Sequence, residues 1–114
     1  MRGEDKKQAR AAYRERAILG GVYAITNTAT GRRLVEATQS LAASRNRFEF
    51  SRTTGLAVTL KLQHDWNTYG AESFVFEVLD ELKKGDAQTQ REFINDLKLL
   101  RESWLEKGHP GGFY

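Results

Sequence analysis

The sequence predicts an α+β fold in which a small, mainly antiparallel three-stranded sheet is flanked by helices. Two short apolar segments, 22–25 and 34–36, surround a polar turn that ends in Gly31, which is the pattern of a β-hairpin. A third segment, 73–79, places three large apolar side chains on one face with the two-residue period of a strand. Helical spacing elsewhere indicates that helices cover this sheet.

The N-terminal segment is the first expected helix. Residues 3–18 are rich in alanine and mostly polar, so they favour a helix with little apolar surface. We therefore expect residues 1–19 to form a charged arm that packs loosely on the domain. Leu19, Gly20 and Gly21 are expected to end this helix with flexible backbone before the hairpin.

Two helices are expected between the hairpin and the third strand. Ser40 is suited to cap the N-terminus of a helix that runs to about Phe50. The segment 53–55 breaks that helix, and residues 56–68 predict the next one. Gly70 stands where a left-handed C-terminal cap is expected.

The last expected helix opens at Gly85 and runs to about Lys107. Its apolar residues follow one another at spacings of four, three and four and form one stripe: Phe93, Leu97, Leu100 and Trp104. Residues 20–110 are therefore expected to form one domain, followed by a mobile tail over residues 111–114.

Composition narrows the class of protein. A chain of 114 residues suits one domain with a modest core. Its lack of cysteine excludes disulfides and thiolate metal sites. The chain has neither an apolar run of about 20 residues nor an apolar leader, so we expect no membrane partner, no signal peptide and a cytoplasmic location.

Basic residues are clustered, although the formal net charge is only +3. The three clusters are Lys6, Lys7, Arg10, Arg14 and Arg16, then Arg32 and Arg33, then Arg45, Arg47 and Arg52. Arginine favours phosphate because its planar guanidinium donates two parallel hydrogen bonds. A solvated surface is the simpler explanation of any single cluster. The second and third clusters, however, flank the same hairpin, which favours binding of nucleic acid.

The hairpin resembles the GIY-YIG endonuclease superfamily. Gly21-Val22-Tyr23 and, ten residues later, Leu34-Val35-Glu36 are similar in place to the Gly-Ile-Tyr and Tyr-Ile-Gly tripeptides that face each other in that family. Further similarities are Arg47 on the next helix, the segment 65–79 that leads into the third strand, and the end of the last helix before Pro110. The resemblance covers residues 20–110 and implies a small three-stranded sheet flanked by helices.

The resemblance also implies a chemistry. In the family a tyrosine assists removal of a proton from the attacking water, an arginine donates to the phosphate, and one carboxylate holds a single divalent metal, here Mg²⁺ or Mn²⁺. It assigns the first two roles to Tyr23 and Arg47. His64 is a candidate for proton transfer or phosphate donation, or an exposed histidine. Contacts with DNA or RNA are expected from six residues: Arg32, Arg33, Arg45, Arg47, Arg52 and Arg101.

The sequence departs from the family at three site positions. Leu34 stands in place of the second tyrosine and cannot exchange a proton. Glu36 replaces the glycine and brings a negative charge toward the phosphate. Counting back from Pro110, the family's metal-binding glutamate falls on Arg101, at the edge of the inward face of its helix, whereas Glu102 is turned toward solvent. The remaining metal candidates are Glu36 or Glu102, or no metal at all.

Three functions follow from this pattern. We prefer a nucleic-acid-binding module that keeps the nuclease fold with lost or impaired cleavage. The first alternative is an active, divalent-metal-dependent endonuclease with a rearranged site built on Tyr23, Arg47 and Glu36. The second alternative is a protein-interaction or regulatory domain that uses the charged arm and either Trp66 or Trp104 as a contact.

Overall fold

The computed structural model describes residues 19–114, so the helix expected over residues 3–18 lies outside the described part. Three strands form one antiparallel sheet in the order β2-β1-β3. Their bounds are Leu19–Asn27 for β1, Arg33–Thr38 for β2 and Phe74–Lys83 for β3. The helices are α2 (Leu41–Thr54), α3 (Leu60–Tyr69) and α4 (Gln90–Glu106), with a short 3-10 turn, η1, at Ala71–Ser73. The α+β prediction is confirmed.

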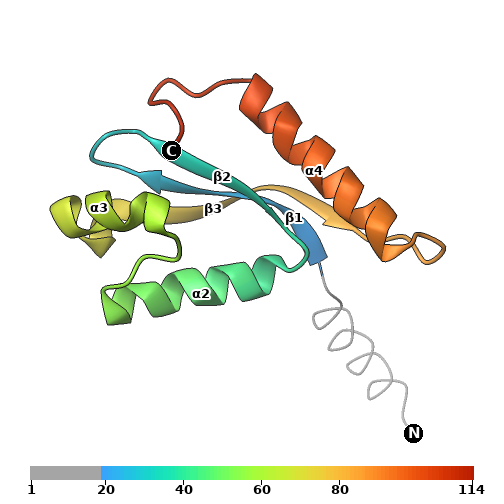
Figure 1. Ribbon diagram of the computed structural model, residues 1–114, viewed down its shortest axis with the longest axis horizontal. Helices are drawn as coiled ribbons and strands as arrows, with labels where there is room; N and C mark the ends of the chain where they lie inside the picture. Colours follow the sequence, from blue (N-terminus) through green and yellow to red (C-terminus); the bar gives the residue numbers. More distant parts are fainter. Residues whose placement is uncertain (1–18) are drawn as a thin grey trace, which may run out of the picture.

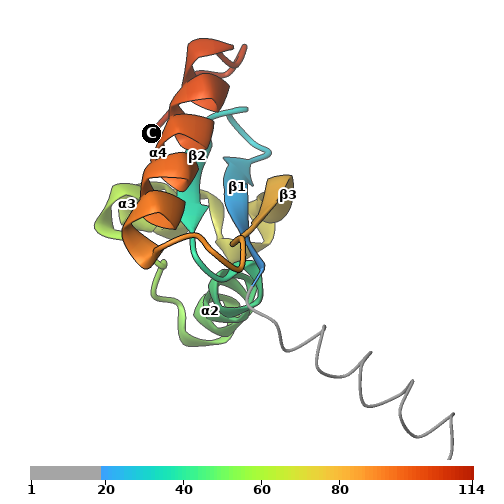
Figure 2. The same ribbon diagram turned by 90° about the vertical axis from the view of Figure 1, so that its right-hand side faces the viewer.

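The helices cover both faces of the sheet (Figures 1 and 2). On one face α2 and α3 bury the alternate residues Tyr23, Ile25 and Leu34. On the other face α4 covers Val22, Ala24 and Val35. The central strand β1 is therefore buried on both sides, which explains its unbroken apolar run. The predicted face of β3 is confirmed, because Phe74, Phe76 and Val78 all pack in the core shared with α2 and α3.

The hairpin is longer than its apolar core. Leu19 and Gly20, expected as the flexible end of a helix, are part of β1 and pair with Lys83 and Leu82 of β3. Pairing with β3 supplies hydrogen-bond partners for the backbone N–H and C=O groups of these two residues. In the part of the chain from residue 19 onward, no helix is both long and apolar enough to cross a bilayer.

The two middle helices differ from prediction in their ends. Ser40 caps α2 as expected, accepting from the Ala43 amide, but the helix continues to Thr54 and ends at the following Gly55, whose φ is 76°. The next helix begins at Leu60 rather than residue 56, because Thr59 is extended and the Ala57 amide bonds the Gln63 side chain instead of a helical carbonyl. Gly70 has φ 87° but ψ 152°, so it turns the chain toward β3 outside the left-handed helical region.

The last helix starts later than expected. It begins at Gln90 rather than Gly85, because Thr89 and Glu92 form a reciprocal capping box. The predicted stripe is confirmed: Phe93 and Leu97 are buried. Leu100 and Trp104 pack against the sheet.

The C-terminal residues 111–114, expected to be a mobile tail, are docked on the hairpin. Phe113 forms a β-bridge with Arg33, whose carbonyl accepts from the Tyr114 amide. The Tyr114 hydroxyl accepts from buried Asn27 at 3.1 Å and donates to Asp65 of α3 at 2.7 Å. These long-range hydrogen bonds join the turn of the hairpin to α3 and hold the segment in place.

Candidate functional site

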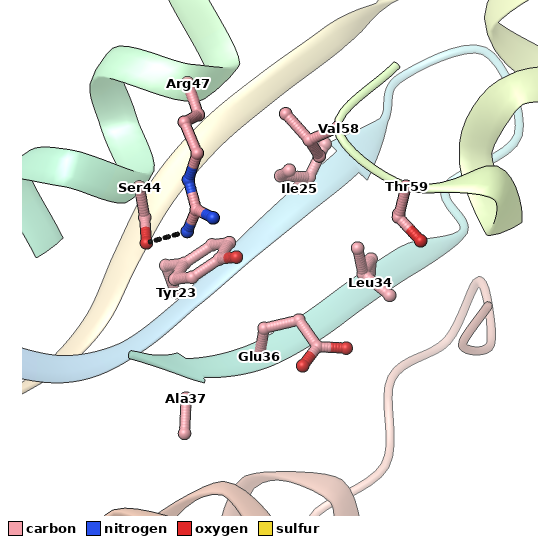
Figure 3. Close-up of a pocket in the computed structure, with 9 residues that line it drawn as sticks. All are labelled: Tyr23, Ile25, Leu34, Glu36, Ala37, Ser44, Arg47, Val58 and Thr59. Carbon is pink, nitrogen blue, oxygen red and sulfur yellow. Dashed lines mark hydrogen bonds between the residues drawn. The ribbon is translucent and has the colours of Figure 1, made fainter. Parts of the chain in front are cut away.

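A pocket of ≈ 340 Å³ lies between the hairpin, the first half of α2 and the start of α3 (Figure 3). We call it the Tyr23 pocket. Its lining residues are Tyr23, Ile25, Leu34, Glu36, Ala37, Ser44, Arg47, Val58 and Thr59. The structure therefore brings together Tyr23, Arg47 and Glu36, three residues that sequence analysis singled out from three separate elements.

Tyr23 forms the floor of the Tyr23 pocket. Its side chain is only 8% exposed, and its ring stacks on Phe76 of β3 with centroids 4.9 Å apart. The pairing of β1 with β3 shifts register between Val22 and Tyr23, a β-bulge that leaves Leu79 as the extra residue. Bulges aim side chains beside active sites, and this one sets the place of Tyr23 on the sheet.

Gly21 makes that bulge possible. A Cβ at this position would stand 2.0 Å from the Asp80 carbonyl oxygen on β3, so the two strands approach more closely there than any side chain allows. The glycine of the Gly21-Val22-Tyr23 tripeptide thus has a packing role two residues away from the tyrosine it helps to place.

Arg47 reaches over the Tyr23 pocket from α2 (Figure 3). Its Nη2 donates to Ser44 Oγ at 3.2 Å, and the buried Ser44 hydroxyl donates to Thr38 on β2 at 2.9 Å. This chain of hydrogen bonds positions an otherwise exposed guanidinium beside Tyr23. Sequence analysis missed Ser44, although a serine three residues before Arg47 shares its helix face.

Glu36 is the acidic residue of the Tyr23 pocket, and it lies directly opposite Tyr23 in the β1–β2 register. Arg101 of α4 reaches it around the free edge of β2. Its Nε donates to the Val35 carbonyl at 2.9 Å, and its Nη2 stands 3.9 Å from the Glu36 carboxylate. Arg101 therefore places a positive charge at the rim of the pocket, where the family resemblance places a glutamate.

Burial, followed by the negative charge of Glu36, raises the pKa of Tyr23 above 10.0, while Ser44 and the charge of Arg47 act in the opposite direction. The phenol is therefore protonated at neutral pH and can donate a hydrogen bond into the pocket. Thr59, the residue just before α3, adds a second hydroxyl to the same space (Figure 3). Sequence analysis missed Thr59 because it placed the start of this helix four residues too early.

We expect the Tyr23 pKa to appear in the alkaline stability of the protein. The unfolded chain ionises this tyrosine first, so its contribution to stability is full below about pH 10 and declines as pH rises through the folded pKa. The melting temperature of the wild type should then fall more steeply above about pH 10 than that of Tyr23→Phe. If the melting temperatures of the wild type and Tyr23→Phe fall equally with pH across this range, the fold does not favour the neutral form of Tyr23.

The other arginines named by the sequence do not line the Tyr23 pocket. Arg33 lies near the hairpin turn and pairs with Glu77 at 3.5 Å. Arg32 donates to the Phe113 carbonyl and lies over the Tyr114 ring, so it contacts the docked C-terminus. Arg45 lies over Phe76, while Arg52 donates to the Phe74 carbonyl at 2.6 Å.

The remaining candidates lie elsewhere. His64 is exposed on α3 and does not line the Tyr23 pocket. Glu102 is exposed on α4, as helix geometry predicted.

The Tyr23 pocket has one acidic side chain to offer a divalent metal. Across residues 19–114, no three acidic or histidine side chains come together as a metal-binding group. Mg²⁺ is usually held by one or two carboxylates together with phosphate oxygens and water. Glu36 is one such carboxylate, but the Arg101 guanidinium stands beside it and would compete with a metal ion for the carboxylate oxygens. An arginine beside this carboxylate weakens it as a ligand for Mg²⁺ or Mn²⁺.

Comparison with known proteins shows what this arrangement resembles. No protein-family model and no curated protein sequence matches the chain. Among solved structures, the catalytic domain of the homing endonuclease I-TevI matches with a TM-score of 0.58 and 19% identity, covering 77% of this chain and 86% of that one. A mutant form of the catalytic domain of intron endonuclease I-TevI matches with a TM-score of 0.57 at 19% identity, covering 79% of this chain and 84% of that one. The chain thus has the fold of a GIY-YIG endonuclease catalytic domain.

Proposed function

We propose that this protein is a nucleic-acid-binding module that keeps a nuclease fold and cleaves phosphodiesters weakly or not at all. One observation carries the proposal: a guanidinium reaches the pocket beside Tyr23, while the acid of the same pocket, Glu36, is paired with Arg101. Such a pocket has the donors to hold a phosphate and lacks a free carboxylate to hold a metal.

Phosphate binding would depend chiefly on Arg47. Its guanidinium is exposed and is held in place by Ser44, so little side-chain freedom is lost when it donates to a phosphate oxygen. The protonated Tyr23 hydroxyl can donate to the same phosphate. Contacts of this kind read the backbone rather than the bases, so DNA and RNA are both expected ligands.

Weak cleavage follows from the groups that surround this phosphate. An attacking water must lose its proton to a nearby base. Leu34, buried at 3% exposure beneath the pocket, cannot accept one. Tyr23 is protonated near neutral pH, as tyrosines ordinarily are, and burial raises its pKa further, so its hydroxyl does not take up a proton there. Arg101 stabilises negative charge without activating water.

Binding and cleavage are tested together. The full chain is titrated into labelled single-stranded and duplex DNA and RNA over a salt series, and the same mixtures are incubated with Mg²⁺ or Mn²⁺ and analysed for nicks. The proposal expects affinity that falls with rising salt and intact nucleic acid. An absence of binding at low salt would contradict it and would favour a protein-interaction domain.

An active, metal-dependent endonuclease is the second candidate, and the place of Glu36 favours it. Its carboxylate is partly exposed and points into the space beside Tyr23 (Figure 3). If that carboxylate held a metal, cleavage would depend on it, whereas in the binding module it only repels the phosphate.

Glu36→Gln separates these two functions. In the binding module the substitution removes a repelling charge and releases Arg101, so nucleic-acid affinity should rise by about two- to fivefold. Glu102→Gln removes the same charge from an exposed position of α4 outside the pocket, and serves as the matched control with little effect expected. Metal-dependent nicking by the wild type that disappears in Glu36→Gln and persists in Glu102→Gln would establish the endonuclease instead.

A further inference from the structure

A second hollow, of ≈ 540 Å³, lies between the outer face of α2 and the loop that follows it. We call it the Phe50 hollow. Its lining residues are Asn46, Arg47, Phe50, Ser51, Thr54, Leu56, Ala57 and Val58. Phe50 is 69% exposed and Leu56 is 68% exposed, so two large apolar side chains face solvent here. Exposed apolar surface gathered in a hollow indicates a binding site more often than scattered residues do.

The Phe50 hollow adjoins the Tyr23 pocket. Arg47 and Val58 line both of them. Arg47 therefore stands at the boundary between a polar space with hydroxyl and guanidinium donors and an apolar space with an aromatic ring. A ligand that fills both must have an anionic group and a flat apolar group a short distance apart.

We propose that the Phe50 hollow binds the base of an unpaired nucleotide whose phosphate lies in the Tyr23 pocket, an inference that rests on the proposed function. A nucleotide carries the required anion and flat ring on one sugar. Proteins that bind single strands combine a basic groove with aromatic side chains on which bases stack, and an exposed Phe50 three residues after Arg47 supplies that pair on one helix face.

The proposal also sets the class of nucleic acid. In a duplex, each base is stacked on its neighbours and its face is closed to a protein side chain. In a single strand the face of the base is free to stack on an aromatic ring. The protein should therefore prefer single-stranded DNA or RNA to a duplex of the same length. The preference should depend on Phe50, while attraction to the phosphate should not.

The experiment compares two single strands of about ten nucleotides, one with bases and one with the same sugar-phosphate backbone but no bases. Wild type, Phe50→Ala and Leu99→Ala are titrated with each strand. Leu99 is the matched control, because it is an exposed apolar residue at 64% on α4, outside the Phe50 hollow. The wild type is expected to bind the strand with bases at least about fivefold more tightly.

Phe50→Ala should remove that difference and leave binding of the baseless strand unchanged, while Leu99→Ala should behave as the wild type. Unchanged binding of both strands by Phe50→Ala would overturn the base site and leave the phosphate proposal standing. If Phe50→Ala weakened binding of both strands equally, the base site would also be overturned and the phosphate proposal would stand, because Phe50 would then support the contact with the sugar-phosphate backbone. Failure of the wild type to bind either strand would overturn both proposals.

Discussion

Replacing Arg47 with alanine is expected to weaken nucleic-acid binding by about 10- to 100-fold, the value of a hydrogen-bonded charge that reaches a phosphate. The same variant should lower the slope of log affinity against log salt by about one. Arg47 is exposed, so the free energy of unfolding should change by no more than about 0.5 kcal/mol. Fluorescence anisotropy over a salt series measures the affinity and the slope together.

Arg91→Ala is the matched control for this loss. Arg91 is also exposed and its replacement removes the same charge, but it lies in the first turn of α4, outside the Tyr23 pocket. We expect its effect on affinity to be small. Equal losses in the two variants would mean that nucleic acid is attracted by overall charge, and would remove Arg47 from a defined phosphate site. Arg47→Lys should recover part of the affinity, since it keeps the charge without the planar fork.

Gly21→Ala is expected to destabilise the fold by about 3 kcal/mol or more, at the upper end of the range for overpacking in a core. The added methyl would stand 2.0 Å from the Asp80 carbonyl, which is backbone and cannot rotate away. Relief requires β1 and β3 to separate at the bulge next to Tyr23. Denaturant unfolding followed by circular dichroism measures the loss of stability.

Gly85→Ala is the control for a change from glycine to alanine as such. Its new methyl would meet the Gln88 Cβ at 3.6 Å, which is ordinary contact, and Gly85 lies in the turn before α4. We expect a change within about 0.5 kcal/mol. Similar unfolding curves for Gly21→Ala and the wild type would show that the strands can separate there at little cost, and that the bulge does not depend on glycine.

Much of this fold could be predicted from local patterns. The turn that ends in Gly31, the capping serine at position 40 and the stripe from Phe93 to Trp104 each depend on neighbouring residues, and the structure confirms them. The start of α3 could not be found this way, because Leu56 stands four residues before Leu60 and so continues the helical spacing in the sequence, although it lines a hollow outside the helix. The docking of Tyr114 depends on Asn27 and Asp65, which are distant in the chain.

The candidate site was predictable only in part. The hairpin resemblance singled out Tyr23, and helix geometry placed Arg101 near an inward edge, where it meets Glu36. The polar chain from Arg47 through Ser44 to Thr38 could not be predicted, because it joins a helix to a strand through a contact set by packing. Of the six arginines named from the sequence, only Arg47 lines the Tyr23 pocket, whereas Arg32 contacts Phe113 and Arg33 contacts Glu77.

A crystal structure of the protein with a short oligonucleotide in the presence of Mg²⁺ or Mn²⁺ tests the central claim most directly. The account predicts an uncut strand with one phosphate hydrogen-bonded to Arg47 and Tyr23, and Glu36 still beside Arg101. A divalent ion bound to Glu36 with Arg101 displaced and the strand cut would contradict it.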